Sequence, residues 1–133
     1  MAREATVTLN EGRFHLELSP SIGGSISAFE WTGADCRLPI LRKCNSPLQN
    51  VLDAACFPLV PFVNRVRGGR FTFRGREVRL KRNMAGDPSP LHGQGWLNPW
   101  TVEDAGERRA TLSFFHHAGE WPWDYEARQE FEL

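Results

Sequence analysis

The strongest constraint on the fold is an alternation of apolar and polar residues with a period of two. Residues 6–9 and 14–18 alternate in this way, and between them Asn10-Glu11-Gly12 has the composition of a turn. A period of two places every second side chain on the same face of a β-strand. No segment of useful length shows the 3.6-residue period of an amphipathic helix. The chain is therefore predicted to be all-β.

The same alternation predicts further strands, and glycine and proline mark the breaks between them. Strands are expected at residues 26–31, 71–73, 78–80, 100–103, 110–115 and 123–133. Residues 32–52 are expected to be a connection with room for a short helical turn, and residues 81–95 a loop. Many short strands separated by turns are typical of an antiparallel β-sandwich. We expect residues 1–133 to form a single β-sandwich domain.

The charge composition argues against two classes of binding partner. The chain carries 16 basic and 16 acidic residues, so its formal net charge is zero. Without a long-range field, neither nucleic acid nor an anionic membrane is an expected partner. No signal peptide and no run approaching the ~20 apolar residues of a membrane helix is visible. Cys36, Cys44 and Cys56 are odd in number and lack metal-site spacing, so free thiols and a cytoplasmic location are expected.

The segment best suited to bind a polar ligand is Leu91-His92-Gly93-Gln94-Gly95-Trp96. Glycine lets backbone approach a ligand closely, and imidazole can exchange a hydrogen bond with a hydroxyl near neutral pH. A loop histidine that only pins the turn would have the same sequence. His15 and the pair His116-His117 are weaker candidates, because adjacent residues of a strand point to opposite faces.

Two further clusters suit a polar ligand. Asn64-Arg65 follows an apolar, proline-rich segment, and the planar guanidinium can hold two hydroxyls at once. A buried structural ion pair is an equal alternative for Arg65. Residues 120–125 combine tryptophans with acids, as sugar sites do, although aromatic residues on a strand more often belong to the core. No residue spacing matches a metal-ligand set, and no metal or other cofactor is expected.

The order of these sequence motifs resembles that of the aldose 1-epimerase (galactose mutarotase-like) family, in particular the N-terminal portion of its bacterial members. Any one of the motifs is weak, but together and in this order they are specific. The matching elements are Leu18-Ser19-Pro20, Gly23-Gly24-Ser25-Ile26, residues 57–66 ending in Asn64-Arg65-Val66, Gly69-Arg70-Phe71 onward to Gly75, Leu91-His92-Gly93, Trp121-Pro122 and Tyr125.

The resemblance implies a large antiparallel β-sandwich that binds a free hexose in an open cleft and interconverts its α and β anomers. In such isomerases a glutamate acts as general base on the anomeric hydroxyl, and a histidine as general acid on the ring oxygen. No cofactor is needed for these proton transfers. The resemblance assigns Arg65 and His92 to the active site. Asn64, Gln94 and Trp96 stand beside them in the sequence, and their amide and indole groups make them the further sugar-binding candidates.

The family's general-acid histidine and late general-base glutamate have no match in these 133 residues. Because members of the family are longer, the chain is expected to be the N-terminal part of an incomplete sandwich, with weak or no activity alone. Two alternatives stay open. A short family member could assemble into homo-oligomers through exposed sheet edges. A non-catalytic carbohydrate-binding sandwich could use Trp96, Trp121 and Trp123 as stacking surfaces.

Overall fold

A computed structural model of the chain describes residues 6–44 and 47–133. These residues form strands β1 to β9 and three short 3-10 turns, and they contain no α-helix. Every strand pairing among them is antiparallel. The predicted all-β class is therefore confirmed.

The first sheet has four strands in the order β1-β2-β3-β4. Its members are β1 (Val7–Glu11), β2 (Phe14–Ser19), β3 (Ser25–Thr32) and β4 (Arg37–Pro39). The predicted hairpin is β1–β2, with Leu9 opposite Leu16. Strand β4 lies in the segment expected to be a connection. All three of its side chains are exposed, so it carries no alternation, and it forms because a turn at Gly33–Cys36 returns the chain alongside β3.

The second sheet has three strands in the order β7-β8-β9. They are β7 (Thr101–Ala105), β8 (Arg109–His116) and β9 (Tyr125–Glu132). Along β9, half-buried residues alternate with exposed ones, as the sequence predicts. The strand begins at Tyr125, two residues later than expected.

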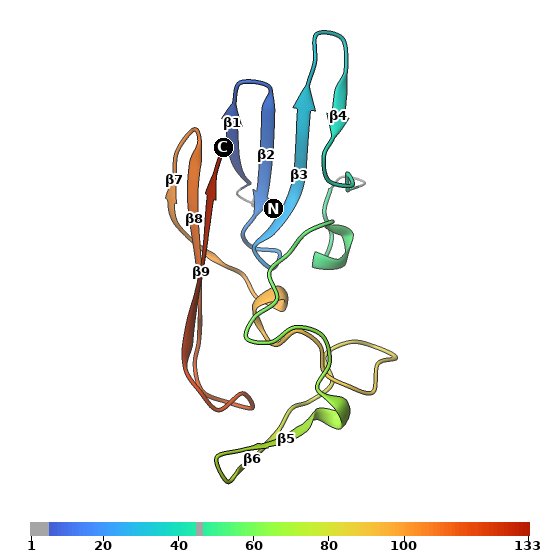
Figure 1. Cartoon of the computed structure of the whole chain (residues 1–133), viewed down its shortest axis with the longest axis vertical. Coiled ribbons are helices and arrows are strands. Elements are labelled where there is room, and N and C mark those ends of the chain that lie inside the picture. Colours follow the sequence, from blue (N-terminus) through green and yellow to red (C-terminus); the bar gives the residue numbers. More distant parts are fainter. Residues whose placement is uncertain (1–5, 45–46) are drawn as a thin grey trace.

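The core lies between these two sheets, which face each other in the upper part of Figure 1. Leu9, Leu18 and Leu112 are fully buried there, and Trp100 joins them from the segment that leads into β7. The backbone N–H of Asn10 donates to the carbonyl of Glu107 (2.7 Å) and links β1 to the turn between β7 and β8. Apolar burial between two antiparallel sheets defines the predicted sandwich.

A third, two-stranded element lies at the opposite end of the molecule (Figure 1). It is the hairpin of β5 (Arg70–Phe73) and β6 (Arg76–Arg79), close to the predicted limits. Arg74 and Gly75 in its two-residue turn both have positive φ, as a type I′ turn requires. The 3-10 turns are η1 (Val51–Asp53), η2 (Arg67–Gly69) and η3 (Gly95–Leu97), the first within the predicted connection.

Cys36 and Cys56 are exposed and Cys44 is buried, and within the described residues none of the three forms a disulfide. Within residues 6–44 and 47–133 no helix has the length and apolar character needed to cross a membrane.

Removing the core side chain of Leu112 should destabilise the sandwich. Leu112 is 0% exposed, so Leu112→Ala should lower the free energy of unfolding by about 2–5 kcal/mol through lost burial and the cavity left behind. Urea denaturation followed by tryptophan fluorescence measures this. The matched control is Leu52→Ala, which removes the same atoms from a residue that is 53% exposed and should cost less than about 0.5 kcal/mol. Equal losses in the two variants would contradict the assigned core.

Candidate functional site

Two loops, residues 60–66 and 90–96, lie side by side and pair through their backbones. Arg65 and Leu91 form an antiparallel bridge between them. Further bonds run from Val66 N–H to Pro90 C=O (3.2 Å), from His92 N–H to Asn64 C=O (3.0 Å), and from Gln94 and Gly95 N–H to Val60 C=O (3.1 and 3.2 Å). We call these segments the paired loops. Their pairing brings Asn64-Arg65 next to His92, although 28 positions separate Asn64 from His92.

The paired loops rest on side chains that satisfy their inward-facing backbone. The Asn83 amide donates to the Leu91 carbonyl (2.7 Å) and accepts from the Leu91 N–H (2.8 Å). The Trp96 indole N–H is shared between the carbonyls of Leu91 and Gly93, at 3.2 Å each. Trp100, part of the sandwich core, donates to the Gly95 carbonyl (2.8 Å). These bonds fix the loops to the fold.

The Trp96 side chain is buried beneath the paired loops and is not exposed as a sugar-stacking residue would be. Only 2% of it is exposed, and its ring packs against Phe57 and the edge of His92. A ring buried to this degree presents no face to a ligand. Trp96 supports the loop from beneath, because an indole N–H inside the protein finds its partners there.

His92 has a defined hydrogen-bonding role. Its Nδ1 accepts the backbone N–H of Asn64 at 2.8 Å, so the proton of the neutral ring sits on Nε2. Burial, followed by the nearby positive charge of Arg65, lowers the pKa of His92 below its ordinary value of 6.5. At neutral pH the ring is therefore uncharged, with an Nε2–H group as its available donor.

The backbone of the site is held in an uncommon conformation. Asn64 and His92 have φ of 69° and 57°, in the left-handed region that non-glycine residues rarely enter, and Gly93 has 71°. A Cβ on Gly93 would lie 2.1 Å from Pro61 Cδ and 2.5 Å from the Val60 carbonyl oxygen. Such strain persists only where surrounding bonds enforce it, and it is typical of functional sites.

Arg65 is anchored at one side of its guanidinium and open at the other. Its Nε donates to Asp87 Oδ2 (2.8 Å) and its Nη1 to Asn64 Oδ1 (3.0 Å). A backbone hydrogen bond from Ser89 and the charge of Arg65 lower the pKa of Asp87, so this carboxylate stays ionised. The Arg65 side chain is 53% exposed, and Nη2 has no partner among the described residues. The ion pair exists, but Arg65 is not buried in it.

Gln94 lies one residue beyond Gly93 and faces a neighbouring space. Its Oε1 accepts the hydroxyl of Tyr125 at 2.8 Å. It lines a cavity of about 120 Å³, together with Phe62, Lys81 and Glu120 among others, and neither His92 nor Arg65 lines that cavity. The structure thus joins Asn64, Arg65 and His92 by direct hydrogen bonds and places Gln94 beside them.

Some supporting residues were not expected from the sequence. Asp87, which orients Arg65, starts an Asp-Pro-Ser turn whose side-chain cap on the Ser89 N–H is a recognisable pattern. Asn83 carries no such signal, because its role depends on Leu91 arriving next to it in the fold. The alternation of residues predicts that Tyr125 lies in a strand, but no sequence pattern predicts the hydrogen bond from its hydroxyl to Gln94.

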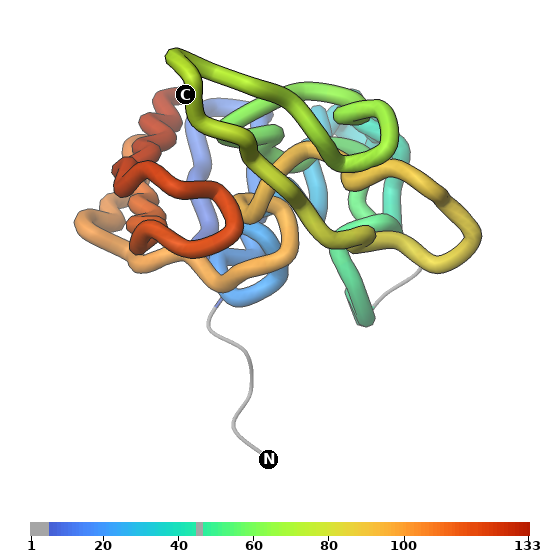
Figure 2. Tube along the Cα trace, turned by 90° about the horizontal axis from the view of Figure 1, so that it is seen from below, coloured from blue at the N-terminus to red at the C-terminus, as the bar shows by residue number. Residues whose placement is uncertain are grey.

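Four aromatic rings form a separate apolar cluster beside the paired loops. In β5, Phe71 contacts Trp121 with 5.9 Å between ring centroids, and Phe73 contacts Trp123 with 5.6 Å; both tryptophans lie in the loop before β9. Together with Arg74, these four rings line an open cavity of about 460 Å³. Phe62 reaches this cluster through Trp121 at 5.7 Å. Figure 2 shows this end of the molecule, with residues 57–90 crossing over the sheets.

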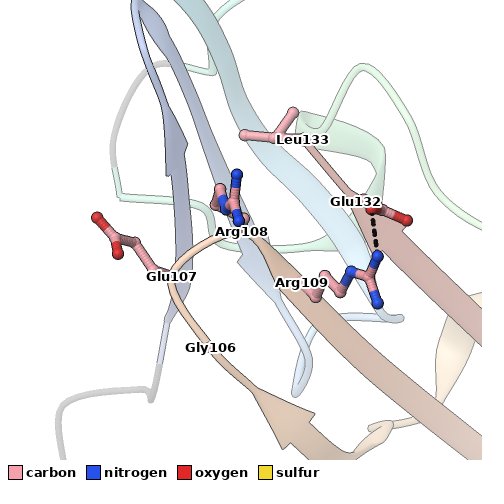
Figure 3. Close-up of a pocket in the computed structure, with 6 residues that line it drawn as sticks. All are labelled: Gly106, Glu107, Arg108, Arg109, Glu132 and Leu133. Carbon is pink, nitrogen blue, oxygen red and sulfur yellow. Dashed lines mark hydrogen bonds and ion pairs between the residues drawn. The ribbon is translucent and has the colours of Figure 1, made fainter.

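A cavity of about 340 Å³ at the turn between β7 and β8 is a weaker candidate (Figure 3). Its two arginines are matched by carboxylates, Arg108 by Glu11 (3.4 Å) and Arg109 by Glu132 (2.6 Å). The arginines of this cavity therefore offer no unpaired positive charge to an anionic ligand. Within the part of the chain that the structure describes, no group of three or more metal-ligating side chains is found.

The fold and the site define an antiparallel β-sandwich with a polar, loop-borne site at one end. The sequence model of the aldose 1-epimerase family matches residues 5–133, and the chain belongs to this family. The Escherichia coli K12 protein YphB, whose function is uncharacterised, is 38% identical over 126 residues, covering 95% of this chain and 41% of YphB. The E. coli protein YihR is 26% identical over 110 residues, covering 83% of this chain and 34% of YihR.

Solved structures agree with the fold. A crystal structure from E. coli K12, described as a candidate aldose 1-epimerase, superposes with a TM-score of 0.83 at 38% identity and covers 97% of this chain. A GalM/aldose epimerase homologue from Caenorhabditis elegans superposes at 0.80 with 15% identity, which supports the fold alone. This chain spans 42% of each of those two structures. The predicted galactose mutarotase-like sandwich is confirmed.

Adding a methyl group at Gly93 should disrupt the paired loops. Gly93→Ala forces a Cβ against Pro61 and Val60 and should lower the free energy of unfolding by about 2–4 kcal/mol from overpacking and positive φ together. The matched control is Gly86→Ala, which has a similar φ of +79° but nothing within 4 Å of the new Cβ. It should lose only the cost of the backbone conformation, about 1 kcal/mol. Urea denaturation of both variants isolates the steric part, and equal losses would refute the close approach.

His92 should titrate below 6.5, and Arg65→Ala should raise its pKa only part of the way back, because burial is the larger cause. Proton NMR of the imidazole measures both values, and Arg128→Ala on β9 should leave the titration unchanged. As the pH falls, His92 of the unfolded chain is protonated before His92 of the folded protein. The free energy of unfolding should therefore keep its full contribution from His92 above pH 6.5 and lose it progressively as the pH falls below that value. A pKa above 6.5 in the folded protein would contradict the arrangement.

Proposed function

We propose that the chain binds a free hexose at the paired loops through His92, Arg65 and Asn64. The observation that carries this proposal is the hydrogen bond from the Asn64 N–H to His92 Nδ1, which leaves Nε2–H as a fixed donor at neutral pH. Membership of the aldose 1-epimerase family supports a sugar as the ligand. Gln94 is the proposed additional contact, while Trp96 acts from beneath the loop.

The roles follow from the donors available. His92 Nε2–H would donate to a sugar oxygen at or near the ring, and a neutral donor there avoids placing a second positive charge beside Arg65. Arg65, held by Asp87 through Nε and by Asn64 through Nη1, would present Nη2 to a hydroxyl of the sugar. Because both side chains are held in place before the ligand arrives, little conformational entropy is lost on binding.

Interconversion of anomers also needs a general acid for the ring oxygen and a general base for the anomeric hydroxyl. His116 is poorly suited, because its Nε2 is bonded to the Trp121 carbonyl (3.0 Å) and its ring stacks on Tyr125. The chain spans about two fifths of its relatives' length. We therefore propose an aldose 1-epimerase-like protein in which these residues hold the sugar, with weak or no turnover by this chain alone.

A second candidate function is carbohydrate binding without catalysis. It is favoured by the aromatic cluster of Phe71, Phe73, Trp121 and Trp123, whose open cavity of about 460 Å³ has the size and apolar lining of a small-molecule site. Aromatic faces stack on the C–H groups of sugar rings. Trp121 and Trp123 line this open cavity and can stack on a sugar, whereas the third candidate tryptophan, Trp96, is buried.

Homo-oligomerisation stays a prediction. Strand β9 pairs with β8 along one edge, and its other edge has no strand partner among the described residues. An unpaired edge of eight residues invites pairing with another strand. A second copy of the chain is the proposed partner.

Removing a sugar-holding group should weaken binding of D-galactose or D-glucose measured by titration calorimetry. His92→Ala and Arg65→Ala should each lower the affinity about 10- to 100-fold, the equivalent of one hydrogen bond involving a charged or buried group. The matched controls are His117→Ala, an exposed loop histidine, and Arg128→Ala, an exposed arginine of β9. Both should bind as the wild type does.

Polarimetry of fresh α-anomer in the same samples separates the two functions. Faster relaxation than in buffer supports the epimerase proposal, and binding without acceleration supports a sugar-holding role only. Unchanged affinity in His92→Ala and Arg65→Ala, with loss in Trp121→Ala, would move the site to the aromatic cluster. No binding of either hexose by the wild type would refute both functions for this chain.

A further inference from the structure

Gln94 is held both at its backbone and at the far end of its side chain. Its backbone N–H donates to the Val60 carbonyl (3.1 Å), and its own carbonyl accepts from Asn98 Nδ2 (2.8 Å). The far end of the side chain is held by the Tyr125 hydroxyl, which donates to Oε1 at 2.8 Å. With both ends fixed, the torsion angles between them have little freedom left.

The amide nitrogen of Gln94 is the part that stays available. No partner for Nε2 occurs within residues 6–44 and 47–133, and the one buried side-chain polar atom without a bond there is Ser25 Oγ. Nε2 is therefore not sealed inside the protein. Gln94 lines the cavity of about 120 Å³, whose other polar groups include the ion pair of Lys81 and Glu120 (3.7 Å).

This cavity adjoins the paired loops. Gly93, which lines it, directly follows His92, and Phe62, which also lines it, lies two residues before Asn64. At about 120 Å³ it is well below the ~300 Å³ at which ligand pockets usually begin. It has room for a hydroxyl or hydroxymethyl substituent, but not for a whole pyranose ring and its solvent.

Tyr125 is itself firmly placed. It opens β9, its ring stacks on His116 (5.1 Å between centroids) and meets the edge of Phe114 (6.0 Å). Burial raises the pKa of Tyr125 to about 12, so the phenol keeps its proton at any physiological pH. The phenol donates its proton to the amide oxygen of Gln94, and this hydrogen bond turns the amide nitrogen away from Tyr125.

We infer that Tyr125 is a positioning residue that orients the Gln94 amide, so that Nε2–H donates to a hydroxyl substituent of the sugar bound at the paired loops. Tyr125 does not touch the sugar in this arrangement. It acts through Gln94 and gives the site selectivity for a sugar with a hydroxyl directed into the small cavity, since a sugar without that hydroxyl would cover the Nε2–H donor and leave it unpaired, which is costly. This inference rests on the proposed sugar-binding function.

The test is a double-mutant cycle on D-galactose and D-glucose affinity, measured by calorimetry on the full chain. Tyr125→Phe removes only the hydroxyl and should weaken binding of the preferred hexose about 5- to 10-fold. Gln94→Met keeps the side-chain length and should weaken it at least as much. In the Gln94→Met background, Tyr125→Phe should cause no further loss, because its effect passes through the amide. The control Ser113→Ala removes another side-chain hydroxyl from the same sheet and should bind normally.

Monodeoxy derivatives of the same hexose give a readout that a purely structural role would not move. One derivative, lacking the hydroxyl that Gln94 contacts, should bind the wild type and Tyr125→Phe equally well, while the others keep the 5- to 10-fold difference. In the absence of sugar, the side-chain amide protons of Gln94 should have chemical shifts displaced from those of an exposed glutamine in the wild type. Tyr125→Phe should move these shifts toward the values of an exposed glutamine.

The outcomes separate the two proposals. If the wild type binds a hexose and Tyr125→Phe binds it as tightly, the inference is wrong while the proposed function stands. The same holds if the loss persists in Gln94→Met, since Tyr125 would then act on the fold in general. If the wild type binds no hexose, the proposed function fails and the inference with it. Should Tyr125→Phe fold poorly, undiminished affinity in Gln94→Met alone would overturn the inference.

Discussion

The backbone pairing between residues 60–66 and 90–96 is the constraint on which the rest of the site depends. The main chains of these loops hydrogen-bond to each other, and the Asn64 N–H donates to His92 Nδ1. Arg65 Nη2 and the His92 Nε2–H group are then left for other partners. The pairing requires the backbone at Gly93 to lie against Val60 and Pro61, at a distance that excludes any side chain. The left-handed conformations of Asn64 and His92 follow from the same close approach.

The sandwich core holds these loops indirectly, through tryptophans that are buried and yet hydrogen-bonded. Trp100 packs among the core leucines and reaches the Gly95 carbonyl, while Trp96 bonds two carbonyls of the hexapeptide. Each indole thereby joins apolar burial to backbone fixation. A loop on the surface of a β-sandwich is ordinarily mobile, and such anchors give it the rigidity that recognition of a small polar ligand requires.

Charge within the site is arranged so that one group is cationic and its neighbour is neutral. Asp87 forms an ion pair with Arg65, and the hydrogen bond from Ser89 and the charge of Arg65 keep Asp87 ionised. Burial disfavours protonation of His92, and the nearby positive charge of Arg65 acts in the same direction. The result is a fixed set of donors, guanidinium and imidazole N–H, with one carboxylate already engaged. Such a set suits hydroxyl and ring oxygens better than it suits an anion that would compete with Asp87.

The sequence by itself determined the all-β class, the β1–β2 and β5–β6 hairpins, the face of β9 and the family, because a period of two and turn residues act locally. It also singled out Asn64, Arg65 and His92. Only the tertiary structure decided what these residues face. Strand β4 has no alternation and exists through its pairing with β3, and Trp96 lies beneath the site because Leu91 and Gly93 need its N–H. The contact of Tyr125 with Gln94 spans 31 positions, and no local pattern encodes a contact between side chains that the fold alone brings together.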